Sequence, residues 1–272
     1  MLPLTQWPLA ARRNIIGVFT DIDDTLTTDG AITPDALAAL GDLKAAGLHV
    51  IAVTGRPVGW SEQVAFGVSK RWPVDAVVAE NGSAAIVLNR LSSSPSQNKH
   101  EPLLKIYQQN LATRSRNYQR MQQVAQRVLR EVPDAVLSQD SGGRETDIAI
   151  DHSEFTHLSP DKIVQVVQIM QSEGMNATVS SIHINGWFGN HNKLMGARWI
   201  VRELFGRDLD SEMSRWAYVG DSTNDQLMFE RFSHSVGVAN IRRFEAELSH
   251  KPRYITLGER GAGFAEVARA LR

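Results

Sequence analysis

Residues 14–25, NIIGVFTDIDDT, join a short hydrophobic run to an abrupt acidic end. The run is rich in large apolar residues and lacks polar alternation, which is typical of a parallel strand buried on both faces. The acidic cluster would then lie at the carboxyl end of that strand. Ligands of open parallel sheets bind beyond the carboxyl ends of the strands, so this stretch predicts an α/β fold and the position of its site.

The sequence after this stretch repeats the order of strand and helix. Residues 33–48 place leucines near helical spacing, with Thr33 as a candidate N-cap. Two further hydrophobic runs with polar ends, 49–56 and 75–83, flank an expected helix over 58–69. This alternation predicts right-handed βαβ units and a doubly wound, Rossmann-like, largely parallel sheet.

The middle of the chain has a different texture. Residues 91–102 are rich in Ser and Pro and predict a loop or linker. The elements expected next are one long polar helix over 103–130, two strands around a Gly-Gly turn over 135–152, a helix over 159–174 and one strand over 176–185. The α/β texture returns at His191. The predicted organisation is therefore a core of residues 1–88 and 191–272, interrupted by an α+β insertion of residues 89–190.

Composition limits the class of protein. The 272 residues include 29 basic and 30 acidic side chains, for a net charge of -1, so no general field attracts nucleic acid or an anionic membrane. The absence of cysteine excludes disulfides, thiolate chemistry and Cys-ligated zinc. No run approaches the ~18 apolar residues of a membrane span, and prolines and arginines interrupt the apolar N-terminus. We expect a cytoplasmic protein with a small-molecule partner; its oligomeric state stays open.

Two acidic clusters follow two separate predicted strands. Asp21, Asp23 and Asp24 form the first, and three carboxylates this close repel one another unless a hard cation such as Mg²⁺ neutralises them. Each cluster taken alone also suits an ordinary turn or helix cap. A second strand ends in GDSTND (220–225) and a third ends in VTGR (53–56), and this coincidence favours one common site.

TDIDDTL, VTGR, the lysine of HNKLMGA and GDSTND occur in this order and resemble the four motifs of the haloacid dehalogenase superfamily of phosphohydrolases. The ENGS segment and the insertion between the second and third motifs are similar to its subfamily with a type-2 α/β cap. That Cof-like branch includes trehalose-, sucrose- and mannosyl-3-phosphoglycerate phosphatases. The resemblance covers residues 15–90 and 190–260, while the cap matches in position and texture. Asp24 stands where many members have glycine.

The resemblance implies a role for each motif residue. Asp21 would be the nucleophile that forms an aspartyl phosphate, and Asp23 would be the general acid and base. Thr54 would donate a hydrogen bond to the phosphoryl group, and Lys193 would neutralise its charge. Asp21, Asp23 through its backbone carbonyl, and Asp221 would hold Mg²⁺. The residues expected to contact substrate are Thr54, Gly55, Arg56, Lys193, Asn224, Arg144 and Asn185.

Several assignments stay open. Arg56 suits either a substrate phosphate contact or a surface ion pair, while Arg144 and Asn185 lie in polar cap segments that suit either substrate or solvent. Asn224 and Asp225 would orient water molecules or Lys193. Glu80 and Asn81 would contact substrate or support the sheet. We expect His191, Trp187, Phe188 and Trp199 to be structural.

The expected activity is hydrolysis of a small phosphate ester, preferably a sugar phosphate. The alternatives are a phosphotransferase or mutase of the same superfamily and a non-catalytic binding protein on this fold. A dehalogenase would have no use for Asp23 or for metal-binding carboxylates.

Overall fold

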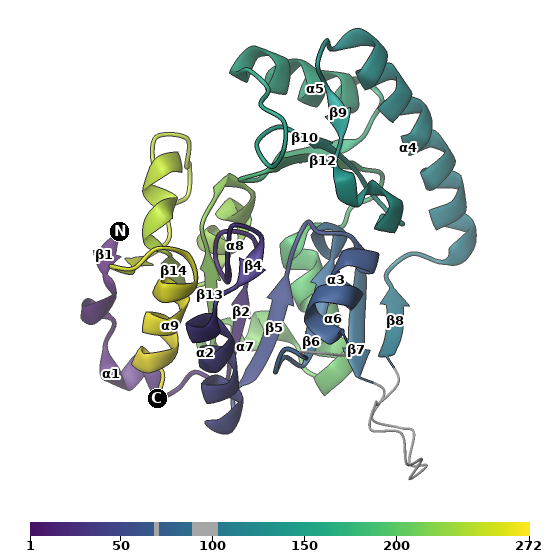
Figure 1. Cartoon of the computed structure of the whole chain (residues 1–272). Helices are drawn as coiled ribbons and strands as arrows, with labels where there is room; N and C mark the ends of the chain where they lie inside the picture. The colour runs from purple at the N-terminus through teal and green to yellow at the C-terminus, as the bar shows by residue number, and fades with distance from the viewer. Residues whose placement is uncertain (68–70, 89–102) are drawn as a thin grey trace.

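A nine-stranded sheet forms the centre of the computed structural model, which describes residues 1–67, 71–88 and 103–272 (Figure 1). Its strands, in spatial order, are β1 (Leu2–Pro3), β15 (Tyr254–Ile255), β14 (His234–Gly237), β13 (Trp216–Gly220), β2 (Gly17–Thr20), β5 (His49–Val53), β6 (Ala76–Ala79), β7 (Ala84–Leu88) and β8 (Leu103–Tyr107). The first seven strands of this spatial order pair with their neighbours in parallel. Strands β7 and β8 then continue the sheet in antiparallel pairing. The first and last parts of the chain meet where β2 pairs with β13.

Helices cover both faces of this sheet. The α-helices in the first and last parts of the chain are α1 (Leu9–Arg12), α2 (Pro34–Ala45), α3 (Val58–Phe66), α6 (Lys193–Phe205), α7 (Leu209–Glu212), α8 (Gln226–Arg231) and α9 (Arg260–Ala270). Short 3₁₀ segments are η1 (Leu4–Gln6), η2 (Glu80–Gly82), η3 (Gln139–Gly143), η4 (Met213–Arg215), η5 (Thr223–Asp225) and η6 (Ala239–Phe244). Helix α2 begins as predicted, with the Thr33 hydroxyl accepting the Ala36 N–H.

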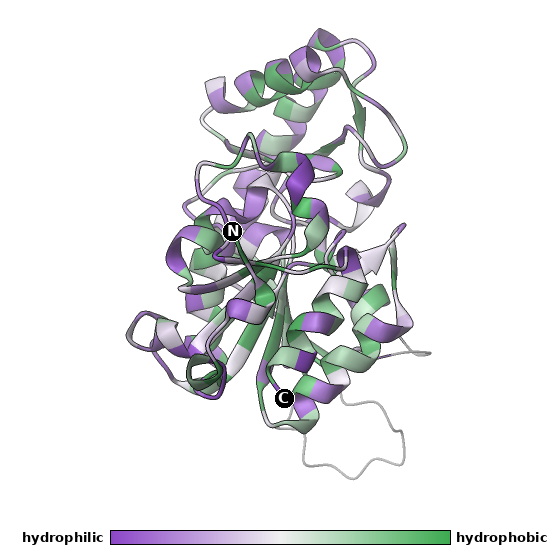
Figure 2. Cartoon of the chain, turned by 90° about the vertical axis from the view of Figure 1, so that its left-hand side faces the viewer, coloured by the Kyte–Doolittle hydropathy of each residue, from purple (hydrophilic) through white to green (hydrophobic). Residues whose placement is uncertain are grey.

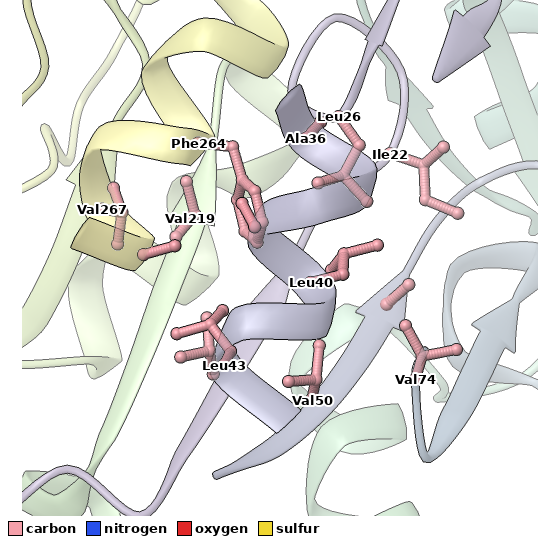
Figure 3. Packing of buried hydrophobic residues seen from close by; sticks show 14 of the residues in the cluster. Ile22, Leu26, Ala36, Leu40, Leu43, Val50, Val74, Val219, Phe264 and Val267 are labelled. Carbon is pink, nitrogen blue, oxygen red and sulfur yellow. The ribbon is translucent and has the colours of Figure 1, made fainter. Parts of the chain in front are cut away.

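Alternation along the strands divides the core into two layers. Val18 packs on the side of α2, α3 and α9, and its neighbour Phe19 packs on the side of α6 and α8. Leu40, Leu43 and Phe264 fill the first layer (Figure 3). Hydrophobic residues fill the central strands, and hydrophilic residues are common on the helices (Figure 2). No helix within the described ranges is both long and apolar enough to cross a bilayer.

A smaller antiparallel sheet lies beyond the carboxyl ends of the central parallel strands (Figure 1). Its order is β11 (Asn176–Val179), β12 (His183–Trp187), β10 (Ile148–Asp151) and β9 (Val136–Leu137), with helices α4 (Leu111–Glu131) and α5 (Pro160–Ser172) packed on it. A separate hairpin, β3 (Thr27–Thr28) and β4 (Ala31–Ile32), follows the first acidic cluster. We call residues 108–190 the cap.

The expected α/β class with a largely parallel sheet is confirmed, and three local predictions are wrong. Residues 103–107 form β8 and not the start of a helix, because apolar residues such as Leu103 and Ile106 pair with β7. The predicted cap boundary at residue 89 therefore assigns part of the core sheet to the cap. Residues 176–185 contain a hairpin rather than one strand. The predicted linker over 91–102 lies outside the described residues, as does the end of the helix predicted over 58–69.

Candidate active site

Three loops at the carboxyl edge of the large sheet bring the predicted residues together. Asp21 follows β2, Thr54 follows β5 and Asp221 follows β13, and these strands are neighbours in the sheet. All three side chains are buried. The convergence expected from the strand ends is therefore what the fold produces.

Lys193 is the first residue of α6 and lies between two carboxylates. Its ammonium nitrogen is 2.5 Å from Asp21 Oδ1 and 2.7 Å from Asp225 Oδ1. The Asn192 side chain accepts the Met195 N–H and so caps the helix at this point. The side chain is only 3% exposed, so Lys193 is a buried member of the site and not a solvated residue at a helix end.

Burial sets the electrostatics of this group. It raises the pKa of Asp21 to about 8, although Lys193 acts in the opposite direction. Burial and the nearby carboxylates, Asp21 first among them, raise the pKa of Asp221 well above its ordinary value. The pKa of Lys193 is raised despite its burial, because Asp21 and Asp225 stabilise the ammonium. The carboxylates outnumber the cation, so the group favours binding of a further cation.

The donor atoms fit a hard divalent ion. Oxygens of Asp21, Asp221 and Asp225 lie within 4.8 Å of one another. Asp225 is already occupied: Lys193 and the Tyr218 hydroxyl bond to Oδ1, and two backbone N–H groups bond to Oδ2. Asp221 Oδ2 accepts the Asn240 amide at 3.2 Å, whereas its buried Oδ1 has no partner among the described residues. Asp21 and Asp221 are therefore the side chains with oxygens available for a cation.

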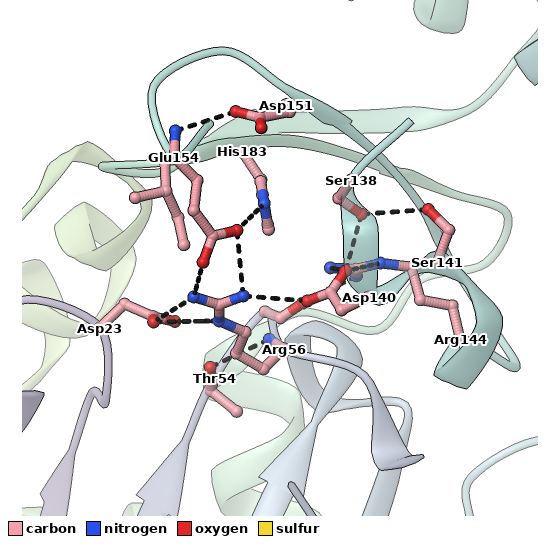
Figure 4. Close-up of polar contacts among 12 residues, drawn as sticks. Asp23, Thr54, Arg56, Ser138, Asp140, Ser141, Arg144, Asp151, Glu154 and His183 are labelled. Atoms are coloured by element: carbon pink, nitrogen blue, oxygen red, sulfur yellow. Dashed lines mark hydrogen bonds and ion pairs between the residues drawn. The ribbon is translucent and has the colours of Figure 1, made fainter. Parts of the chain in front are cut away.

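Asp23 faces the cap and pairs with Arg56 (Figure 4). Arg56 Nε lies 3.0 and 3.1 Å from the two Asp23 oxygens, and the guanidinium also contacts Glu154 at 2.6 Å and Asp140 at 3.1 Å. Of the two alternatives left open for Arg56, the surface ion pair is wrong, because the arginine is 4% exposed and its ion pairs join core and cap; contact with substrate phosphate stays a prediction. Glu154 also lies 2.8 Å from His183 Nε2.

The loop after β5 places the Thr54 hydroxyl at the carboxyl edge of the sheet. The Thr54 hydroxyl accepts the Arg56 N–H at 3.0 Å, which leaves its own hydrogen to donate. Gly55 is tightly enclosed, because an added Cβ would lie 3.3 Å from the side chains of Asn81 and Asn185. Its carbonyl accepts hydrogen bonds from two cap residues, Arg144 at 2.9 Å and Asn185 at 3.3 Å.

Arg144 and Asn185, two residues expected to contact substrate, form hydrogen bonds with other residues of the protein. Arg144 NH1 bonds to both oxygens of Asp147, and its other nitrogens bond to Asp140, so its donors are committed to protein atoms. Asn185 donates to Asp147 at 2.9 Å but still borders the site. The small cavity at the site, about 10 Å³, is lined by Asp21, Asp23, Gly55, Arg56, Ser180, Ser181, Ile182, His183, Asn185, Ser222 and Asn224.

Glu80 is one of the residues whose role the sequence left open. Its fully buried carboxylate accepts N–H groups of Val58, Glu145 and Thr146 and the Thr146 hydroxyl. It therefore supports the contact between η2 and the cap. The position of Glu80 after a hydrophobic run indicated a polar residue at the sheet edge, but no signal in the sequence indicated that its hydrogen-bond partners would be Val58, Glu145 and Thr146.

Asp24 and His191 have local structural explanations. Asp24 has a φ of +54°, in the left-handed region that favours glycine. Its carboxylate pairs with Arg260 at 3.0 Å. His191 stacks on Trp187 and accepts the indole N–H through its carbonyl, while burial lowers its pKa to about 4.

A doubly wound sheet with carboxylates and a buried lysine at its carboxyl edge, beneath an inserted cap, defines the haloacid dehalogenase-like class. The sequence model of haloacid dehalogenase-like hydrolases matches residues 18–256, and the chain belongs to that family. No curated protein matches the chain by sequence.

Solved structures share the fold at low identity. A putative HAD/COF-like hydrolase of Plasmodium vivax has a TM-score of 0.67 at 15% identity, with 97% of this chain and 99% of that chain covered. The sucrose-phosphatase of Synechocystis sp. PCC6803 has a TM-score of 0.62 at 16% identity, covering 95% and 98%. The C-terminal domain of C. albicans trehalose-6-phosphate phosphatase has a TM-score of 0.64 at 14% identity, covering 100% and 98%.

Proposed function

We propose that the protein is a Mg²⁺-dependent phosphomonoesterase that hydrolyses a small phosphorylated metabolite, preferably a sugar phosphate, with Asp21 as the nucleophile. The observation that carries this proposal is the buried Lys193, held between Asp21 and Asp225, together with the nearby Asp221 Oδ1, for which the described part of the chain provides no hydrogen-bond partner. A buried cation beside a carboxylate with available oxygens can stabilise both a phosphoryl group and the residue that attacks it.

Each step can be assigned to a residue of this chain. An Asp21 oxygen attacks phosphorus, the bond from phosphorus to the ester oxygen breaks, and Asp23 gives that oxygen a proton. Asp23 then takes a proton from water, whose oxygen attacks the phosphorus of the aspartyl phosphate and releases inorganic phosphate and free Asp21. Lys193 balances phosphoryl charge, and Thr54 donates its hydroxyl hydrogen to a phosphoryl oxygen.

Asp21, Asp221 and the Asp23 backbone carbonyl would hold the Mg²⁺ ion, with Asn224 beside them. When bound, the ion would add positive charge next to the transferring phosphoryl group. The preference for sugar phosphates is supported by the structural similarity to sucrose-phosphatase and trehalose-6-phosphate phosphatase. A phosphotransferase would use the same first step with a hydroxyl acceptor in place of water.

The test is phosphate release from a panel of sugar phosphates, other monoesters and nucleotides, in Mg²⁺ and in EDTA. Asp21→Asn is compared with Asp161→Asn, a change at an exposed acid of the cap. We expect release that needs the metal, is abolished in Asp21→Asn and is unchanged in Asp161→Asn. Release only when a hydroxyl acceptor is added would favour the phosphotransferase, and undiminished release by Asp21→Asn would refute the assigned nucleophile.

A further inference from the structure

Arg56 and the carboxylates around it form the cap side of the site (Figure 4). Arg56 is 4% exposed, and its guanidinium contacts Asp23 of the core together with Asp140 and Glu154 of the cap. One cation is thus shared among three anions. Its Nε–H points at Asp23, and its terminal nitrogens bond to the cap carboxylates.

The neighbouring side chains also have partners. Arg144 is divided between Asp140 and Asp147, and the Nε2 atom of His183 lies 2.8 Å from Glu154. Although burial opposes it, Arg144 and the other nearby cations hold the pKa of Asp140 at about 2, so this carboxylate stays ionised at neutral pH. A second anion on the substrate would therefore meet the carboxylate oxygens of Asp140 and Glu154 here. Among the described residues at this place, both guanidinium groups are already bonded to protein carboxylates.

The leaving group of the substrate must lie on this side. Asp23 protonates the leaving oxygen in the proposed mechanism, and Asp23 is bonded to Arg56. The cavity of about 10 Å³ at Asp21 and Asp23 cannot contain a sugar. Arg56 lines this cavity and also a hollow of about 540 Å³, lined in addition by Trp60, Asp140 and Glu154, whose volume is sufficient for a larger leaving group.

We propose that Asp140 and Glu154 act as a charge filter that selects phosphate esters with an uncharged polyhydroxylated leaving group and rejects esters whose leaving group carries a second anion. The inference rests on the proposed function and specifies its substrate class. Hydroxyl groups can donate hydrogen bonds to these carboxylates. A carboxylate or second phosphate would meet like charge in a partly buried place, and such repulsion discriminates between otherwise similar ligands.

Matched ester pairs test the filter. Glycerol 3-phosphate and 3-phosphoglycerate differ by a hydroxymethyl group against a carboxylate, and glucitol 6-phosphate differs from 6-phosphogluconate by the same exchange. We expect kcat/KM to favour the uncharged member by about tenfold or more, the factor given by about 1.4 kcal/mol of repulsion. Glu154→Gln and Asp140→Asn should each reduce this preference severalfold, whereas Asp161→Asn should leave it unchanged. High salt should reduce it in the unmodified protein, which requires no variant.

Binding of the same pairs to Asp21→Asn, measured by calorimetry, separates the two proposals. Equal kcat/KM and equal affinity within both pairs would overturn the filter alone. A preference that persists in both cap variants and at high salt would also overturn the assignment to Asp140 and Glu154. If Asp21→Asn binds the esters with the expected preference but the unmodified protein hydrolyses no ester of the panel, the result would support the filter and refute the phosphatase. No binding of any of the four esters would overturn the filter, and the wider panel would then decide the phosphatase proposal separately.

Discussion

Replacing Lys193 by methionine should nearly abolish activity. Methionine keeps the length and apolar stem of the side chain but removes the ammonium that lies 2.5 Å from Asp21 Oδ1 and 2.7 Å from Asp225 Oδ1. A phosphoryl group in position for attack by Asp21 is about 3–3.5 Å from the attacking oxygen, so its own oxygens come within about 4 Å of the ammonium. At that distance a charge pair contributes about 4 kcal/mol for an effective dielectric constant near 20.

This energy corresponds to a loss of about 10³-fold in kcat/KM. A second effect acts in the same direction, because Lys193 lowers the pKa of Asp21 and its removal would leave more of the nucleophile protonated at neutral pH.

The assay is phosphate release in Mg²⁺ with the best ester of the panel, with circular dichroism as a check on folding. Lys162→Met is the matched control, because Lys162 is an outward cap lysine that pairs with Asp134. A folded Lys193→Met protein that keeps more than about a tenth of the activity would refute this reasoning, because the ammonium would then contribute less than about 1.4 kcal/mol to phosphoryl transfer.

Two further predictions concern the contact between cap and core. Glu80→Gln should lower the free energy of unfolding by about 2–3 kcal/mol, because the amide N–H₂ of glutamine would face the backbone N–H groups that now donate to Glu80. Urea unfolding measures this change, with Glu173→Gln at an exposed position as the control. Equal unfolding midpoints for the two variants would contradict the prediction. Burial raises the pKa of Asp147 to about 7, so the folded protein retains a proton there that the unfolded chain loses above about pH 4. Its contribution to the free energy of unfolding therefore falls as pH rises from about 4 to 7, by up to about 1.4 kcal/mol per pH unit. Asp147→Asn should remove this slope in unfolding curves measured across that range, and a slope equal to that of Asp161→Asn would be expected if the assignment to Asp147 is wrong.

The core and the convergence of its motifs could be predicted because their signals are local. The run that ends at Asp21 is apolar and unbroken, and Thr33 caps its helix as such residues do. Once strands and helices alternate, the topology of a parallel sheet brings the strand ends together without any knowledge of side-chain contacts. Strand β8 was missed because its short run directly precedes a long polar helix, although Asn110, which caps α4 by accepting the Thr113 N–H, was a signal for the start of that helix.

The cap contacts could not be predicted because they depend on packing between distant residues. Arg56 and Glu154 are 98 positions apart, and a polar loop tip has the same sequence whether it binds sugar, solvent or another loop. Arg144 illustrates this, since its partners are Asp140, Asp147 and the carbonyl of Gly55. The charge of Arg144 indicated a polar residue near the site, but it did not indicate which residue would bind the guanidinium.

The pairing of β2 with β13 has a consequence for how the protein is made. Asp21 and Asp221 extend from these adjacent strands but are separated by 200 positions in the chain, with the whole cap between them. A ribosome-bound chain that has completed the cap still has β2 at an open edge, and the acidic group is complete only after residues 221–225 have emerged. The proposed metal ion could therefore stabilise the protein only late in synthesis, and chains that terminate within α6 would expose a hydrophobic strand edge prone to aggregation.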